Sequence, residues 1–493
     1  MAKDVNIFNV PSSLISRCYD EEQNLPKYRT DFMRDRDRLM YATAFRRLAG
    51  KTQIYTVGRD DHKKNRLTHT IEVAQIARTI AIALDLNADL AEAIAIAHDF
   101  GHTPFGHAGE RMLHDIMVPN STYVRNSPFY MTDVSKIAER FDRESDEQKN
   151  YLNVAFGFKH NLQSIRVCAS LEDSYRNADN ENVGLNLTNF TLYGMMIHSS
   201  LTYKQEDSAW NKVKTQKDTQ YPNYQMTFSR QVAITGTNMQ AWSFEAYIVK
   251  LADDIAQWHH DLEDAMREGA LPIAKICDTI NRSLGKCLTT YERERLEQLR
   301  EHSLMDRKCL AELSHIVVNT LVNDVVKTSK KNFVQLQAEI KQKKVKTAER
   351  LFKEYDCFNF SIKRDEVITL SKKVKRAEFE GIIRGAVHHS RNVERMNEKG
   401  KYIIRKLFEA YCAHPQQLPD GPILHMLVEM HWPGYENLSV AKSKSIGEAR
   451  VEFEKAMKNP NIFQQCLLMR RICDHIASMT DHYAIEEYNN LYG

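Results

Sequence analysis

The sequence has no continuous apolar segment of about 18 residues, the length that a membrane-spanning helix needs. Residues 1–10 lack the cationic start and apolar run of a secretion signal. No Cys-x-x-Cys pair occurs among the nine cysteines, and their scatter and odd number are typical of reduced, mostly buried thiols. We therefore expect a cytoplasmic protein with no membrane segment and no disulfide framework.

An excess of charge of one sign is also missing, because 68 Lys and Arg stand against 65 Asp and Glu, a net charge of +3. This balance argues against a dedicated duplex-DNA binder with a basic surface. A basic tract between Lys327 and Arg376 could still contact nucleic acid, although an exposed helical hairpin is the simpler interpretation. Gly-x-Gly-x-x-Gly and P-loop motifs are absent, so dinucleotide-binding and P-loop folds are not supported.

The 493-residue sequence shows helical periodicity, because apolar residues recur at spacings of three and four. Hydrophobic residues make up 42%, enough for a packed core. We expect an all-α fold with an amino-terminal arm at 1–30, a core at 31–270 and a helical region at 271–493. Two polar stretches, 118–150 and 205–230, predict a loop and a surface loop or lid.

The densest chemistry lies in residues 94–110, where three histidines, two carboxylates and three glycines follow an apolar run. Asn87 can cap a helix over 88–98, whose apolar stripe includes His98, so we expect His98 to face the core. A buried imidazole needs partners for both ring nitrogens. A metal ion on one nitrogen and a protein acceptor on the other would supply them.

A second helix should follow this stretch. Gly101 is expected to stop the first helix in the usual carboxyl-terminal manner. Thr103 and Pro104 are then predicted to be the cap and the first residue of the next helix. Within it His107 and Glu110 are three residues apart and share one face.

Two other helical segments carry polar side chains beside apolar stripes. Arg66 and His69 share a face near the start of a helix that runs to about residue 86, capped by Asn65 or Thr68. An adjacent acid pair at 253–254 interrupts a helix over 242–266, and a carboxylate on a buried face is costly unless it is paired or metal-bound. Periodicity does not say which acid faces inward. Two imidazoles with two carboxylates suit Mn, Mg, Fe, Co or Ni better than a structural zinc.

These pieces resemble the HD superfamily, with its His…His-Asp…Asp pattern. The resemblance is closest to the deoxynucleoside triphosphate triphosphohydrolases, which include bacterial dGTPases and SAM/HD-domain dNTP hydrolases. The matching segments are 46–48, 51–53, 66–70, 98–107, 109–110, 158–167, 251–255, 261–264 and 478–481. The resemblance implies an all-α HD-domain fold whose carboxyl-terminal helical region completes the pocket and makes oligomer contacts.

The resemblance also implies a role for each motif residue. The implied metal ligands are His69, His98, Asp99 and Asp253. It thus selects Asp253 over Asp254, where periodicity is silent. His107 and Glu110 match the catalytic pair beside the α-phosphate. The implied substrate contacts are Gln53 near the sugar 3′-hydroxyl, Arg66 and His102 at the phosphates, and His160 and Asn161 in the same pocket.

The implied reaction is hydrolysis of a dNTP, dGTP in particular, to a deoxynucleoside and inorganic triphosphate. Water attacks the α-phosphorus, with a divalent ion such as Mn, Mg or another first-row transition metal as cofactor. Two alternatives stay open. One is another HD phosphohydrolase, acting on nucleoside monophosphates, cyclic dinucleotides or an alarmone. The other is a non-catalytic nucleotide sensor or nucleic-acid binder.

The resemblance also implies partners, but this sequence departs from the family pattern at some positions. It implies a homo-oligomer, either a hexamer or a tetramer, with a nucleotide as activator and single-stranded DNA as a further partner. Three positions depart from the family pattern. Lys159 replaces an acid, Gln257 stands where many relatives have tyrosine, and residues 202–204 read Thr-Tyr-Lys where relatives often have Lys-Tyr-Pro.

Overall fold

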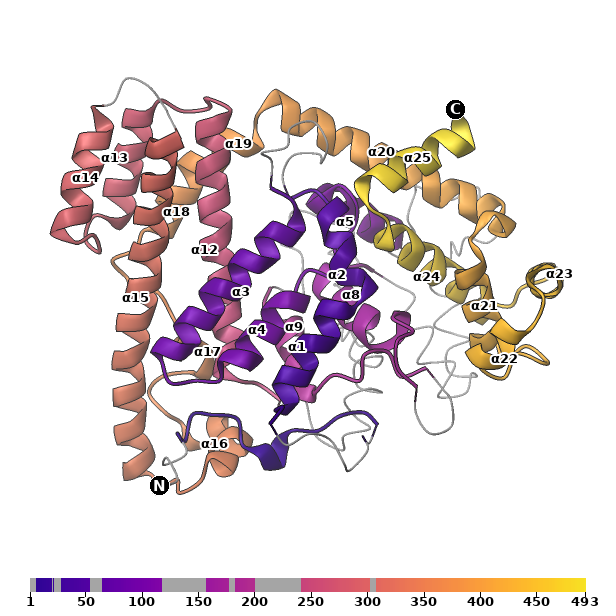
Figure 1. The fold of residues 1–493 in the computed structure, drawn as a ribbon, viewed down its shortest axis with the longest axis horizontal. Coiled ribbons are helices and arrows are strands. Elements are labelled where there is room, and N and C mark those ends of the chain that lie inside the picture. The colour runs from indigo at the N-terminus through magenta and orange to yellow at the C-terminus, as the bar shows by residue number, and fades with distance from the viewer. Residues whose placement is uncertain are drawn as a thin grey trace, which may run out of the picture.

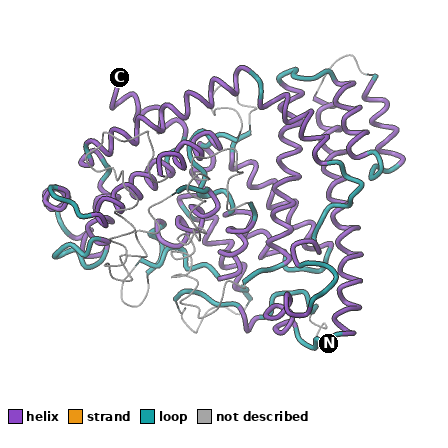
Figure 2. The backbone as a smooth tube through the Cα atoms, turned by 180° about the vertical axis from the view of Figure 1, so that it is seen from behind, coloured by secondary structure: helices purple, strands orange, loops and turns teal. Residues whose placement is uncertain are grey.

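The fold is seen in a computed structural model that describes residues 6–19, 21, 28–53, 64–117, 157–176, 182–199, 241–301 and 307–493. The predicted loop at 118–150 and the predicted lid at 205–230 lie outside these residues. Within them the ordered elements are helices, joined by loops and three isolated β-bridges, and no strand occurs (Figures 1 and 2). The prediction of an all-α fold is therefore confirmed.

Five helices pack together at the start of the stretch 94–110. They are α1 (Asp31–Tyr41), α3 (Arg66–Ala83), α4 (Ala88–Ala97), α9 (Asn189–Ile197) and α12 (Phe244–Arg267). The short α4 packs against the other four, and its residues from Leu90 are buried except Glu92. Because apolar neighbours cover α4, its carboxyl-terminal end carries His98 and Asp99 into the interior.

Side-chain caps fix where α3 and α4 begin. Asn65 accepts the amide of Thr68, and Asn87 accepts the amides of Asp89 and Leu90. Asn87 caps α4 as the sequence predicts, and of the two caps that the sequence left open for α3, Asn65 and Thr68, the structure has Asn65. An asparagine side chain there satisfies amides that lack an intrahelical partner.

The turn into α5 (Gly106–Met117) differs from the prediction. Phe105 and Gly106 have φ angles of 62° and 58°, so the chain reverses through two left-handed residues and α5 begins at Gly106. The hydroxyl of Thr103 donates to the carbonyl of Gly106 and caps no amide. The prediction that Thr103 and Pro104 start the helix is wrong, because this reversal cannot be read from cap residues.

Gly101 is required by packing. The first helix already ends at Ala97, and Gly101 has no left-handed φ, so the prediction that it stops that helix is wrong. A Cβ at Gly101 would lie 2.1 Å from the carbonyl oxygen of His160 and 2.3 Å from the amide of Ser164. Glycine therefore lets α8 (His160–Arg166) touch the loop after α4.

The carboxyl-terminal helices form a second core with α5. The helices of this core are α20 (Arg391–Ala413), α21 (Asp420–Glu429), α22 (Leu438–Ser443), α23 (Ile446–Met457), α24 (Ile462–Ser478) and α25 (Asp481–Tyr492), with α20, α24 and α25 on one side of the molecule in Figure 1. The remaining helices of the described chain are α2 (Thr43–Arg47), α13 (Ile273–Leu284), α14 (Thr290–Arg300), α15 (Arg307–Gln342), α16 (Ala348–Glu354), α17 (Arg364–Val367), α18 (Arg376–Phe379) and α19 (Gly385–His388). The predicted boundary at 270 stays a prediction.

Hydrogen bonds tie the carboxyl-terminal helices to the loops around α5. Asp481 accepts the amide of Phe105 at 2.9 Å and the amide of Thr52 at 3.1 Å. The buried Nζ of Lys51 donates to the carbonyls of His102 and Ala477. Distant parts of the chain therefore hold one loop in place.

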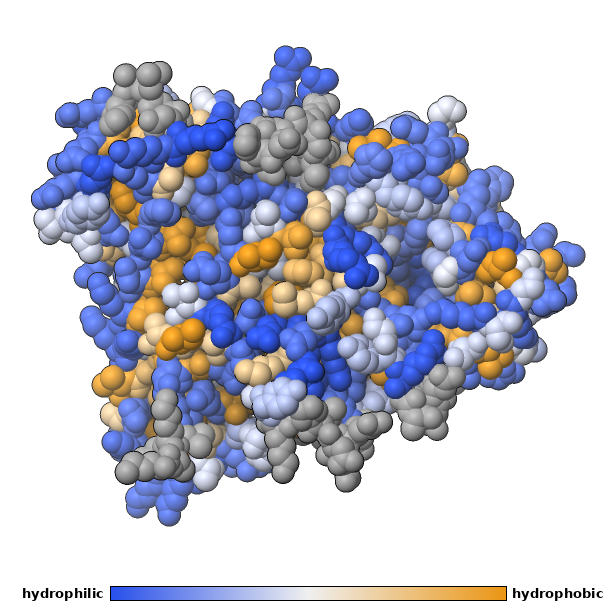
Figure 3. All heavy atoms as spheres, viewed as in Figure 1, coloured by the Kyte–Doolittle hydropathy of each residue, from blue (hydrophilic) through white to orange (hydrophobic). Residues whose placement is uncertain are grey.

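By length and composition alone, α15 could cross a membrane, with a mean hydropathy of 1.2 over its most apolar window. Half of that window is buried inside the protein, and α15 packs against α12 and α13. A core helix of a globular protein passes the same test, so α15 is weak evidence for a membrane segment. Hydrophilic residues cover most of the face in Figure 3, with apolar patches among them.

Glu245 in the first turn of α12 predicts a pH-dependent stability. It is fully buried, Oε1 accepts the amide of Asn87 at 2.9 Å, and Oε2 has no hydrogen-bond partner among the described residues. Burial outweighs its hydrogen bonds and raises the pKa of Glu245 from 4.5 to about 7. Between these values the folded state binds a proton that the unfolded state lacks, so stability falls as pH rises through this window.

Glu245→Gln keeps the acceptor for Asn87 and removes the charge. We expect the variant to exceed the parent in unfolding free energy by about 2–3 kcal/mol at pH 8 and to differ little at pH 5, as measured by denaturant titration. The control Glu349→Gln, in an exposed pair with Lys353, should have the unfolding free energy of the parent at both pH values. Equal gains at pH 5 and pH 8 would contradict the buried-proton explanation.

Candidate functional site

Four predicted site residues converge where α3, α12 and the end of α4 meet. Nε2 of His69 lies 3.0 Å from Oδ1 of Asp253, and Nε2 of His98 lies 3.8 Å from that oxygen. Nε2 of His98 is also 3.5 Å from Oδ1 of Asp99. Ligands on a tetrahedral cation with bonds of about 2.0 Å are about 3.3 Å apart, so these spacings suit ligands of one ion.

The environment of Nε2 of His98 shows whether a cation would fit between these side chains. Nδ1 of His98 donates to the carbonyl of Ala95 at 2.7 Å, which leaves Nε2 as an acceptor. This Nε2 is buried and has no hydrogen-bond partner among the described residues. A lone pair that faces two carboxylate oxygens is unfavourable without a cation between them. The donor set therefore fits a divalent ion that accepts nitrogen and oxygen ligands.

Arg66 at the start of α3 offers an anion site beside these ligands. It is 1% exposed, and its Nη1 donates to Oδ2 of Asp99 at 2.6 Å. Its Nε and Nη2 have no hydrogen-bond partner within the described part of the chain. A Cβ on Gly106 would make only an ordinary van der Waals contact with Nη2, at 3.4 Å, so this glycine is explained by its φ of 58°. Two unpaired, fixed N–H donors suit a phosphate.

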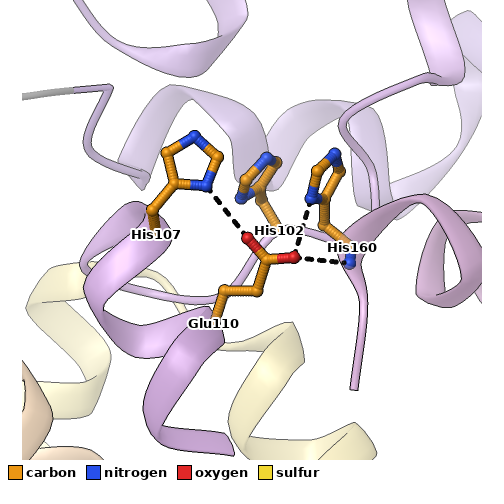
Figure 4. A group of neighbouring side chains, drawn as sticks. All are labelled: His102, His107, Glu110 and His160. Carbon is orange, nitrogen blue, oxygen red and sulfur yellow. Dashed lines mark hydrogen bonds and ion pairs between the residues drawn. The ribbon is translucent and has the colours of Figure 1, made fainter. Parts of the chain in front are cut away.

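Glu110 on α5 accepts hydrogen bonds from two histidines (Figure 4). Nδ1 of His107 donates to Oε2 at 2.9 Å, and Nδ1 of His160 donates to Oε1 at 2.9 Å. Burial alone would raise the pKa of Glu110, but the charge of His160 and both hydrogen bonds hold it well below its usual range. An ionised carboxylate only accepts, so it fixes both rings with Nδ1 protonated. The ring of His107, 53% exposed, is left with Nε2 free to react.

His102 lies between these two groups. Its ring stacks on that of His160 with centroids 3.9 Å apart, and its Nε2 is 3.3 Å from Oδ1 of Asp99. Burial, followed by the charges of Arg66 and His160, lowers the pKa of His102 well below its usual range, so the ring is neutral. The metal-ligand set and the Glu110 pair are therefore parts of one connected site.

Two predicted substrate contacts have their side chains engaged inside the protein. Nε2 of Gln53 donates to Gln257 at 3.0 Å, and Gln257 donates to Asp261 at 2.8 Å. Burial raises the pKa of Asp261 to about 6. The amide nitrogen of Asn161 donates to the carbonyl of Met196 at 2.8 Å. Gln53 thus reaches α12, whereas the fully buried Asn161 supports the end of α9.

Two buried residues at the site have no predicted role. His198 follows α9, its Nε2 lies 3.2 Å from Nε2 of His160, and its ring centroid is 5.1 Å from that of His98. Burial, and then His98 and His160, lower the pKa of His198 to about 3. No motif spacing links His198 to the other histidines. For Lys51, the sequence offered one indication of a role, because this residue lies in the segment 51–53 that matches the family pattern.

Comparison with known proteins gives two domain matches. Residues 66–169 match the HD domain, and residues 368–423 and 451–490 match the phosphohydrolase-associated domain. The first range contains most of the convergent residues, and the second contains Ala477 and Asp481, which hold the loops.

Relatives match over nearly the whole chain, and those named here are deoxyguanosinetriphosphate triphosphohydrolase-like proteins. The protein from Azoarcus sp. (strain BH72) is 31% identical over 98% of this chain and 95% of the relative. The protein from Bartonella quintana (strain Toulouse) is 31% identical over 95% of this chain and 91% of the relative. The protein from Bordetella pertussis (strain Tohama I) is 30% identical over 98% of this chain and 94% of the relative.

The adjacent acids on α12 allow a matched test of metal binding. Asp254 pairs with Arg376, with Nη2 and Oδ1 2.7 Å apart, whereas Asp253 faces His69. We expect Asp253→Asn to weaken Mn²⁺ binding at least about 100-fold, because an anionic ligand is lost. Asp254→Asn should bind Mn²⁺ as the parent does. Calorimetric titration of metal-free protein measures both, and equal affinities would refute the assignment of Asp253.

Proposed function

This chain belongs to the deoxyguanosinetriphosphate triphosphohydrolase-like family of HD-domain phosphohydrolases, and we propose that it hydrolyses dNTPs, dGTP in particular, to a deoxynucleoside and inorganic triphosphate. Identity of 31% over 98% of the chain supports the family. One observation carries the proposed reaction: Arg66, with unpaired donors, is bonded to Asp99 of a convergent metal-ligand set, and His102 and His160 connect that set to the His107–Glu110 pair. That arrangement suits attack of water on a phosphorus atom.

The residues that would hold the divalent ion are His69, His98, Asp99 and Asp253. When bound, such an ion lowers the pKa of a coordinated water and neutralises phosphate charge. Mn²⁺, Mg²⁺ or another first-row transition metal is proposed as the cofactor. The chain's own contribution is to hold these ligands rigid, since three of the four are less than 5% exposed.

Arg66 would bind the phosphoryl oxygens through Nε and Nη2. Asp99 fixes the guanidinium through Nη1, so the two free donors are already oriented before substrate arrives. Charge that develops on the phosphoryl oxygens then meets fixed donors with little reorganisation. Buried donors are worth more than exposed ones, because water does not compete with them.

His107 would move the proton. Glu110 holds the proton on Nδ1, so Nε2 is the atom that accepts a proton from the attacking water or, once protonated, gives one to the leaving 5′-oxygen. The ionised Glu110 stabilises the imidazolium in either direction. The stacked rings of His102 and His160 would border the phosphates on the same side.

The other end of the substrate would meet α12. We propose that Gln53, held by Gln257, lies near the sugar 3′-hydroxyl, and that Asn161 acts by supporting the backbone beside His160. A cytoplasmic homo-oligomer, a hexamer or a tetramer, with a nucleotide activator and single-stranded DNA as partners, is proposed from family resemblance.

Product analysis tests the reaction. The protein is incubated with Mn²⁺ or Mg²⁺ and each of the four dNTPs, and we expect triphosphate and deoxynucleoside in equal amounts. His107→Ala should lower kcat by about 10²–10⁴-fold with a smaller change in KM, because proton transfer is lost while phosphate contacts remain. The control His315→Ala, at an exposed position of α15, should leave both constants unchanged.

Other outcomes separate the alternatives. Release of orthophosphate or pyrophosphate would favour another kind of HD phosphohydrolase. A protein that hydrolyses no dNTP, yet binds nucleotide equally well with His107→Ala and Glu110→Ala combined, would favour the sensor.

A further inference from the structure

Helices α3 and α12 each contribute one histidine and one acid to the interface where the two helices pack together. On α3, Glu72 follows His69 by three residues, and on α12, His260 follows Asp253 by seven, so each pair shares a helix face. His69 and Asp253 pair across this interface, and Nε2 of His260 donates to Glu72 at 2.6 Å. A second acid–histidine pair therefore lies next to the proposed metal ligands.

The second ring nitrogen of His69 needs an acceptor. Nε2 of His69 faces Asp253, so the proton stays on Nδ1 when Nε2 binds a cation. This Nδ1 is buried and has no hydrogen-bond partner among the described residues, whereas Nδ1 of His98 donates to the carbonyl of Ala95. A metal-bound histidine almost always donates a hydrogen bond through its second nitrogen. His69 is thus the ligand histidine whose partner is still missing.

His260 carries a lone pair that matches this donor. Burial lowers the pKa of His260 to about 3, which keeps the ring neutral. A carboxylate only accepts, so Glu72 holds the proton on Nε2 and leaves Nδ1 of His260 as an acceptor. This Nδ1 is buried too, and the described part of the chain offers it no partner. A buried donor and a buried acceptor without partners each cost free energy, which a bond between them would recover.

The rings of His69 and His260 lie at the separation that such a bond requires. Their centroids are 5.1 Å apart, and the ring planes meet at 66°. A hydrogen bond of about 2.9 Å between nitrogens of two imidazole rings gives a centroid separation of about 5 Å. Both rings are also held in place, because the side chain of His69 is 1% exposed and that of His260 is 2% exposed.

We propose that His260 is a positioning residue of the metal centre, whose Nδ1 accepts the Nδ1 proton of His69 when His69 binds the cation through Nε2. Glu72 takes part because it fixes the tautomer of His260, and Lys64 pairs with Glu72 at 2.9 Å. These residues orient the ligand ring and raise its basicity. The inference rests on the metal ligands of the proposed function and not on which nucleotide is hydrolysed.

Two opposite substitutions separate the hydrogen bond from packing. His260→Phe keeps a ring without the acceptor, whereas His260→Gln keeps an acceptor and a donor without the ring. In calorimetric titration of metal-free protein with Mn²⁺, we expect His260→Phe to bind about 10–100-fold more weakly than the parent and His260→Gln to lie between them. The control His259→Phe removes the adjacent histidine, which contacts Glu72 and Glu263, and should bind Mn²⁺ as the parent does.

An independent measurement reports on the remote ring nitrogen itself. In protein loaded with one equivalent of Cu²⁺, electron spin echo spectroscopy detects the nitrogens of ligand histidines that are not bound to the metal. Their quadrupole coupling changes with hydrogen bonding. We expect one of two such nitrogens to change in His260→Phe and neither to change in His259→Phe, with circular dichroism confirming that each variant is folded.

The possible results lead to different conclusions. Equal Mn²⁺ affinity of the parent and His260→Phe would overturn the inference, and weaker binding by His260→Gln than by His260→Phe would assign His260 a packing role instead. A parent that binds no Mn²⁺ would overturn the inference together with the proposed ligands. A parent that binds Mn²⁺ and gives the expected differences, yet cleaves no dNTP, would reject the proposed function alone.

Discussion

The buried carboxylate of Asp99 constrains everything around it. An ionised carboxylate inside a helical core costs several kcal/mol unless positive charge and hydrogen bonds compensate it. Arg66 supplies a guanidinium at 2.6 Å from one oxygen, and the other oxygen faces the rings of His98 and His102. The start of α3, the end of α4 and the loop after it are therefore held at one point by charge. Arg66 uses only one of its nitrogens to pair with Asp99, so Nε and Nη2 stay available for the phosphate contact that we propose.

Glu110 is a second buried carboxylate that needs compensation, but its partners differ from those of Asp99. Here the compensation comes from imidazole N–H groups, so the carboxylate also decides which ring nitrogens are protonated. His107 is left half exposed and His160 is buried, although the same acid orients both. The two acids thus have different roles. Asp99 pairs with Arg66 and faces two histidine rings, whereas Glu110 determines which ring nitrogens of His107 and His160 carry a proton.

The sequence was most informative where structure is decided locally. Asn65 and Asn87 cap their helices as predicted, and the periodicity that placed His98 in the core is matched by its complete burial. The roles of Thr103 and Gly101 could not be read in this way. The left-handed reversal before α5 and the contact of α8 with Gly101 depend on residues far along the chain. His198 could not be predicted from the sequence either, because only the packing of α9 brings it to His160.

The bonds from Lys51 and Asp481 make the site a product of both halves of the chain. Asp481 accepts the amide of Thr52 across 429 residues, and Lys51 reaches the carbonyl of Ala477 across 426. Contacts between residues so far apart in sequence need both ends of the chain, and forming them costs the conformational entropy of a long loop. A ribosome must therefore have released almost the whole polypeptide before the loop that carries His102 and Phe105 is fully held. An incomplete nascent chain that ends before residue 477 would lack both bonds, so this loop would not be held in it.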